Sequence, residues 1–170
     1  EKTMSLYDDF VPPLSNGLKA LSKVLAKAEA HCEARKIDPA VLLSFRLYPD
    51  MFNLTRQVQI ACDQARRGAV RLKGAEPESV PDTEVTFTDL KGRIANTLAA
   101  LAALKPADFD GAEGRTISFK AGPNELSFKG ADYIRFWILP KSRGTDKAIE
   151  AADRVAGARR VASLIKTEEK

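Results

Sequence analysis

Apolar residues recur at alternating spacings of four and three near the start of the chain, which predicts a long amphipathic helix. The members of this seam are Leu14, Leu18, Leu21, Leu25, Ala28 and Cys32. Proline suits the first turn of a helix and disfavours its interior, so Pro12 and Pro13 are expected to mark the start. The pattern therefore predicts a first helix over residues 12–35.

The same spacing predicts two more long helices, with a short helix before the first of them. Asp38 and Pro39 should open the short helix, and Pro49 should end it. The second seam is Met51, Leu54, Val58, Ala61, Ala65, Ala69 and Leu72, with Gly74 as its stop signal. The third is Phe87, Leu90, Ile94, Leu98 and Leu101, capped by Thr83 or Thr86 and ended by Pro106.

The period then changes from helical to alternating, which predicts a β-hairpin. In "RTISFKAGPNELSFKG" the residues Ile117, Phe119, Leu126 and Phe128 alternate with polar positions around a turn-forming "AGPN". Helix is expected to resume at Asp132 as a cap. A last, alanine-rich seam follows at Ala148, Ala152, Val155, Ala158, Ala162 and Ile165. Together these elements predict an all-α, up-and-down four-helix bundle with a small β-hairpin before its last helix.

Length and composition add a setting to this architecture. With 170 residues, 44% of them hydrophobic and 29% charged, the chain is expected to form a single domain over residues 1–170. Met4 is the expected native start, with residues 1–3 as an artificial extension. No apolar run has the length of a membrane span, and no signal pattern precedes the first helix, so we expect a cytoplasmic protein without membrane contact.

The charge balance does not indicate a nucleic-acid partner. The net charge is +4, and residues 141–170 hold eight basic and five acidic residues, which gives +3 of that total. No basic stripe is interleaved with stacking aromatic residues. A solvated helix face is favoured over a phosphate-binding surface, so we expect no nucleic acid.

The residues that commonly carry catalysis or bind metals are few. His31 is the only histidine, and it is adjacent in sequence to Cys32, so the two side chains point about 100° apart on a helix. They cannot easily converge with Cys62 on one zinc ion, and His31 is only a weak candidate for a metal ligand. Both cysteines are expected to be buried free thiols. We assign no catalytic residue, no metal site and no cofactor.

A polar set at the start of the second long helix is the candidate pocket. It comprises Asp50, Arg56, Gln57, Gln59 and Asp63. One interpretation is a helix-packing network in which Arg56 pairs with Asp63 or Asp50, with Gln57 facing inward. The alternative is a pocket between helices for a small apolar ligand.

Four stretches resemble a bacterial family of unknown function related to the DinB/YfiT-like four-helix bundles. They are "MSLYDDFVPPLSNGLKALSKVLAKAEAH", "RLYPDMFNLTRQVQIACDQA", "GRTISF" and "KGADYIRFWILP", and the resemblance covers residues 4–140. DinB-like bundles often bind a divalent metal through about three histidines, and some are thiol-dependent transferases or hydrolases. Residues 141–170 depart from the family pattern, with no histidine or aromatic residue, and Gln64 stands where relatives can have histidine.

Three hypotheses about function follow. The first is a non-catalytic cytoplasmic bundle that binds a partner or itself, with a homodimer expected because the alanine-rich last helix permits close packing. The second is a metal-dependent hydrolase or transferase of the DinB-like superfamily. The third is a small-molecule binding module that uses the region around Gln57.

Overall fold

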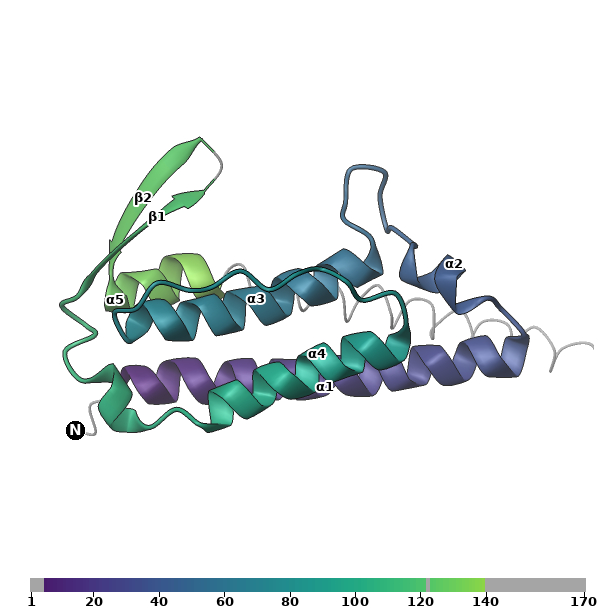
Figure 1. The fold of residues 1–170 in the computed structure, drawn as a ribbon, viewed down its shortest axis with the longest axis horizontal. Coiled ribbons are helices and arrows are strands. Elements are labelled where there is room, and N and C mark those ends of the chain that lie inside the picture. The colour runs from purple at the N-terminus through teal and green to yellow at the C-terminus, as the bar shows by residue number, and fades with distance from the viewer. Residues whose placement is uncertain (1–4, 122, 140–170) are drawn as a thin grey trace, which may run out of the picture.

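The computed structural model of the protein describes residues 5–121 and 123–139 (Figure 1). Its helices are α1 (Leu6–Arg35), α2 (Pro39–Leu43), α3 (Leu54–Leu72), α4 (Phe87–Ala102) and the 3₁₀ turn η1 (Pro106–Phe109). The strands β1 (Thr116–Ala121) and β2 (Asn124–Lys129) follow, and then α5 (Gly130–Asp132), which continues as the π-helix η2 (Tyr133–Ile138). The predicted seam over residues 148–165 lies outside the described residues.

The first helix begins earlier than the prolines indicated. The Ser5 side chain accepts a hydrogen bond from the Asp8 backbone N–H, which caps a helix that contains Pro12 and Pro13 in its interior. Both prolines are exposed, while Phe10 is fully buried. Burial of the added turn thus outweighs the two missing backbone donors, and the predicted start at residue 12 is wrong.

The other helix boundaries agree with the caps more closely than with the prolines. Asp38 caps α2, but that helix ends at Leu43 rather than at Pro49. Asn53 caps α3, which therefore starts after Met51. Thr86, one of the two expected residues, caps α4 in a capping box with Asp89.

The connection between α3 and α4 changes the topology. Residues 75–85, which we call the strap, run back along the whole of α3, so α3 and α4 point in the same direction and both oppose α1 (Figure 1). Arg66 of α3 donates to the Glu78 carbonyl, and Arg56, farther back on α3, pairs with Asp82. The described helices therefore do not alternate up and down, because the strap returns the chain to the start of α3.

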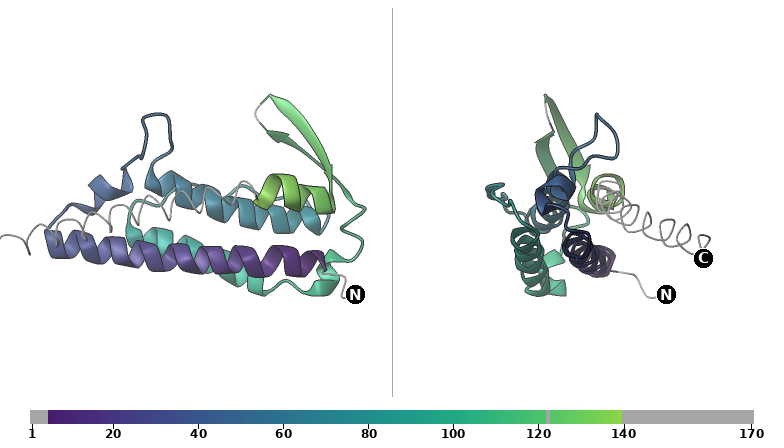
Figure 2. Two further views of the ribbon diagram at one scale, coloured as in Figure 1. Left: turned by 180° about the vertical axis from the view of Figure 1, so that it is seen from behind. Right: turned by 90° about the vertical axis from the view of Figure 1, so that its right-hand side faces the viewer.

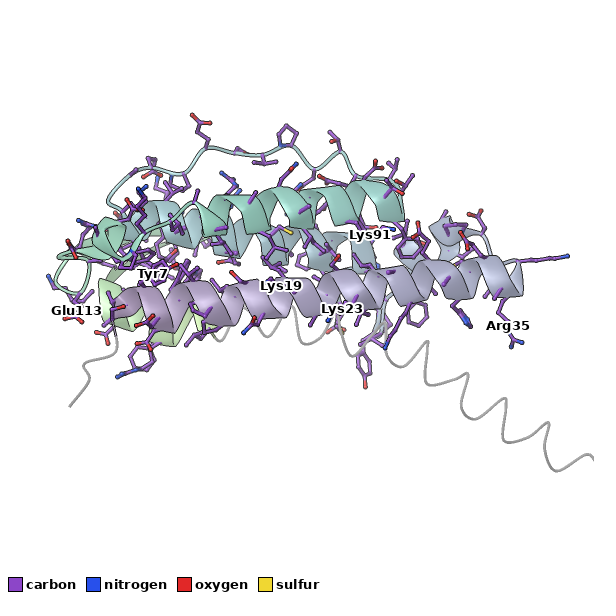
Figure 3. All side chains as sticks on the ribbon, turned by 90° about the horizontal axis from the view of Figure 1, so that it is seen from below. Tyr7, Lys19, Lys23, Arg35, Lys91 and Glu113 are labelled. Carbon is purple, nitrogen blue, oxygen red and sulfur yellow. The ribbon has the colours of Figure 1, made fainter. Side chains whose placement is uncertain are left out.

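The hydrophobic core lies among α1, α3 and α4, which occupy three corners when the molecule is seen end-on (Figure 2). All six residues of the first predicted seam are buried, and so are six of the seven in the second. Met51 is half-buried outside α3, and Leu98 is half-buried on α4. At the edge, Lys91 on α4 pairs with Glu29 on α1 (Figure 3). Nearly every described seam residue is thus buried, although the core also includes residues outside the seams, such as Phe10, Phe109 and Tyr133.

The predicted β-hairpin is present, and its aromatic residues pack against η2. Its strands are antiparallel, with Ile117 opposite Phe128 and Phe119 opposite Leu126. The Phe119 ring lies 4.8 Å from that of Trp137 and 5.5 Å from that of Tyr133, measured between centroids. These aromatic contacts bury the apolar face that a hairpin needs to cover in water.

The last described helix starts at Gly130, not at an Asp132 cap. Lys129 occupies the position before it and makes no side-chain capping bond. A Cβ atom placed on Gly130 would lie 1.9 Å from the Ala112 carbonyl oxygen. The chain therefore turns from β2 into α5 at a point where two backbone segments touch, which only glycine permits.

Candidate functional site

A buried arginine on α4 organises the polar residues between α3, α4 and the strap. Nη2 of Arg93 lies 2.8 Å from Oδ1 of Asp63, and Nη1 lies 3.0 Å both from Oδ1 of Asp82 and from Oε2 of Glu84. Arg93 is 7% exposed, and its Nη1 also donates to the Pro81 carbonyl. We call Arg93, Asp63, Asp82 and Glu84 the Arg93 cluster.

Three of the five predicted pocket residues join or touch this cluster. Gln59 donates to Glu84 at 2.9 Å, Asp63 is a member, and Arg56 pairs with Asp82. The expected pairing of Arg56 with Asp63 or Asp50 is therefore wrong, because the strap brings Asp82 to it. Arg93 and Arg67 neutralise Asp63 instead.

The other two predicted residues lie apart from the cluster. Asp50 is exposed in the connection before α3. Gln57 is half-buried, and its Nε2 is 3.4 Å from the Phe52 carbonyl rather than in a packing network. The reason is that α4 and the strap cover the face of α3 that carries Gln59 and Asp63. Gln57 lies on a different face of the helix.

Sequence reasoning missed Arg93, Asp82 and Glu84. Arg93 adjoins Ile94 and follows Leu90 by three residues, so it falls on the buried side of the third seam. A charged residue at such a position indicates a buried ion pair, which was the available signal. The two acids come from the strap and had no periodic pattern to reveal them.

Mutual neutralisation is the main electrostatic property of the cluster. Burial alone would raise the pKa of Glu84, but hydrogen bonds from Gln59, its own backbone N–H and Arg93 lower it below the ordinary value. Burial alone would lower the pKa of Arg93, and its bonds to Glu84 and Asp63 raise it instead. Glu84 is thus held as a carboxylate against Arg93, which suits a clamp on the strap.

Next to the cluster lies a cavity of about 470 Å³ that contains Cys62, Thr97 and Asn96 in its wall. Burial raises the pKa of Cys62 to about 11, although the Thr97 hydroxyl and the Arg93 guanidinium act to lower it. Since the thiolate is the reactive form, this thiol is held unreactive near neutral pH.

The Cys62 thiol is expected to react with an aromatic disulfide reagent at pH 8 at least about 100-fold more slowly in the native protein than in urea. A pKa of about 11 rather than its usual 9.0 cuts the thiolate population by that factor. Absorbance of the released thiol, followed in a Cys32→Ser variant, isolates Cys62. Rapid modification of folded protein would contradict this account.

His31 and Cys32 are both buried at the end of α1. Nδ1 of His31 has no hydrogen-bond partner in the described part of the chain, and burial raises the pKa of Cys32. Among residues 5–121 and 123–139, no group of three or more His, Cys, Asp and Glu side chains is arranged to hold a metal ion. The family resemblance implies histidines within residues 141–170, which lie outside the described residues. A metal-dependent activity therefore stays a prediction.

One surface segment is unusually apolar. Between α1 and α3, the side chains of Val41, Phe45, Tyr48 and Phe52 are 59%, 46%, 61% and 58% exposed. We call these four residues the apolar surface; they belong to α2 and to the segment that projects after it (Figure 1). Single exposed apolar residues are ordinary, whereas a group of large ones within twelve positions commonly marks an interaction site.

The fold and these sites define a helical domain with a β-hairpin at one end and a clamped strap. Residues 6–142 match the family described as "Domain of unknown function (DUF1993)", and the chain belongs to that family. A crystal structure of a DinB family member protein from Shewanella denitrificans is similar, with 37% sequence identity and a TM-score of 0.79 over 89% of this chain and 86% of that one. Among curated proteins, none matches the chain. In the described residues no helix is long and apolar enough to cross a membrane.

Proposed function

We propose that this protein is a non-catalytic cytoplasmic domain that forms a homodimer through its apolar surface. The observation that carries the proposal is the exposure of Val41, Phe45, Tyr48 and Phe52 in one short segment. The other large exposed apolar side chains in the described chain are Val85, which stands alone, and the pair Phe136 and Leu139 in the last described helix. Aromatic residues at this density are characteristic of the buried centre of protein interfaces.

The charges within the segment favour a second copy as the occupant. Arg46 and Asp50 lie among the four apolar residues, both are exposed, and neither forms an ion pair with another described residue. A two-fold interface places the same surface of each subunit face to face, so Arg46 of one copy can meet Asp50 of the other. The surface is therefore apolar and complementary to itself in charge.

The proposed lack of catalysis rests on the state of the reactive groups in the described chain. The acids of the Arg93 cluster are engaged with arginine, and the Cys62 thiol stays protonated near neutral pH. Neither arrangement supplies a free base or a nucleophile. The cluster is better suited to hold the strap than to do chemistry.

Charge reversal on this surface should control dimerisation. Arg46→Asp and Asp50→Arg are each expected to weaken the dimer at least about tenfold because two like-charged contacts form across the two-fold axis. The double variant should recover association, since the pair is restored with its signs exchanged. Sedimentation velocity over a range of concentrations measures each dissociation constant.

Two further variants separate the apolar contribution from the charges. Tyr48→Ser with Phe52→Ser should abolish the dimer while leaving the melting temperature of the monomer nearly unchanged, because both side chains are exposed. Phe136→Ser, an exposed aromatic at the hairpin end, is the matched control and should leave association intact. A wild-type protein that stays monomeric at every concentration, or a dimer indifferent to all these changes, contradicts the proposal.

A further inference from the structure

A second arginine, Arg71 on α3, lies half-buried beneath the hairpin without an acidic partner. Its Cζ is 4.5 Å from the centre of the Phe119 ring, and its Nη1 donates to the Tyr133 hydroxyl at 3.2 Å. Its buried Nε has no hydrogen-bond partner, and Arg71 forms no ion pair with residues 5–121 and 123–139. A guanidinium in this state retains unused donors and an uncompensated charge.

Its hydrogen-bond partner, the Tyr133 hydroxyl, does not neutralise it. Burial raises the pKa of Tyr133, although Arg71 and Arg67 act to lower it, so the phenol stays uncharged at neutral pH. Arg93 offers a contrast within the same fold, since three carboxylates, those of Asp63, Asp82 and Glu84, contact it at 3.0 Å or less. Arg71 has a hydrogen bond and an aromatic ring where Arg93 has acids.

Arg71 lines a cavity of about 330 Å³ between α3, the hairpin and η2, which we call the hairpin cleft. Its other main walls are Arg67, Lys120, Gln64, Phe119 and Trp137, and no carboxylate is among the lining residues. Nη2 of Arg67 lies 3.3 Å from Oδ2 of Asp63, but Arg93 lies closer to the same carboxylate, at 2.8 Å. The cleft thus combines three cations with two aromatic rings.

We propose that the hairpin cleft binds a small aromatic carboxylate, with the carboxylate on Arg71 and the ring against Phe119 and Trp137. A guanidinium is planar and its parallel N–H donors match a carboxylate. The flanking aromatic side chains supply the apolar contact area that an inorganic anion could not use. The cavity is at the small end of the range for ligand sites, so a single ring with a short acidic arm fits its size.

The protein carries its own reporter for this site. Trp137 is the only tryptophan in the chain, so its fluorescence reports on the cleft alone. Titration with phenylacetate is expected to change that fluorescence saturably. Phenylacetamide, which has nearly the same shape without the charge, should bind at least about tenfold more weakly, because a hydrogen bond to a charged group is lost. Equal binding of the two would overturn the role of the charge.

Variants on α3 test the assignment of Arg71. Arg71→Met should weaken phenylacetate binding by about tenfold to a hundredfold, and Arg71→Lys should restore part of it. Arg66→Met is the matched control, because Arg66 lies on the same helix, lines the cavity beside Cys62 and donates to the strap. Binding by Arg71→Met at wild-type affinity would overturn the assignment.

A second variant and a competing inorganic anion also test the binding of phenylacetate. If Arg71→Met fails to fold, Arg67→Met, at a half-exposed position, should still weaken binding several-fold while leaving the fold intact. Inorganic phosphate should compete poorly with phenylacetate, since it cannot contact the rings. Absence of saturable binding by phenylacetate to wild-type protein, or equally strong binding by phosphate, would overturn the ligand class.

Discussion

Replacing Arg93 with methionine is expected to lower the free energy of unfolding by about 3–5 kcal/mol. The change leaves Asp63 and Glu84 buried and charged, with side chains only 11% and 12% exposed, after their shared cation is removed. It also releases the strap, whose Asp82 and Pro81 carbonyl bind the same guanidinium. Urea denaturation followed by circular dichroism measures the loss.

The matched control is Arg56→Met, which removes the other arginine that holds Asp82. Its side chain is 41% exposed and that of Asp82 is 35% exposed, so the pair is screened by water and should contribute less than about 1 kcal/mol. A similar loss in the two variants would show that the Arg93 cluster is no more important than a surface pair.

Acid should weaken the same clamp. The pKa of Glu84 is lowered on folding, so its contribution to stability is present above the unfolded pKa and is lost as the pH falls through the folded value. In the Arg93→Met protein the acid limb of the stability curve should flatten, because the cation that helps to lower this pKa is gone. An unchanged acid limb would assign the effect to other carboxylates.

Gly130→Ala is expected to be highly disruptive, with a loss of at least about 3 kcal/mol or failure to fold. The added Cβ would lie 1.9 Å from the Ala112 carbonyl oxygen and 2.8 Å from its carbon. Both atoms are backbone, so relief requires that the start of α5 move away from the segment before β1. The melting temperature of the purified variant is the direct measurement.

The same glycine-to-alanine change at Gly92 is expected to stabilise the protein. Gly92 lies inside α4, is exposed, and has nothing within 4 Å of an added Cβ. Alanine there should raise the free energy of unfolding by about 0.5–1 kcal/mol, because it lowers the entropy lost by a helical residue. If Gly130→Ala were as well tolerated as Gly92→Ala, the close approach of the two backbones would be wrong.

The periodic seams predicted the core because burial on one face of a helix is a local property of the sequence. Leu18, Leu25 and Val58 could be placed inside from spacing alone, and the alternation around Phe119 was enough to predict the hairpin. The helix starts were less predictable. Pro12 and Pro13 indicated a start at residue 12, but an exposed proline on a long buried helix costs less than that helix gains.

The candidate pocket was predicted only in part, because its other half comes from the strap. Gln59 and Asp63 are four positions apart on one helix face, which the sequence shows directly. Asp82 and Glu84 follow Pro81 in a segment without any period, and nothing local indicates which way such a segment travels. Arg93 was the informative residue, since a cation on an apolar face requires acids from elsewhere.

The length of the strap is matched to the length of α3. A helix of 19 residues is about 28 Å long, and residues 75–85 reach about 36 Å when fully extended, so the strap has little slack. Deletion of three or four strap residues would therefore prevent α4 from starting beside the beginning of α3. Insertions in the strap can loop outward, whereas deletions must be matched by a shorter α3. Homologous chains with a trimmed strap should accordingly have lost about a turn of that helix.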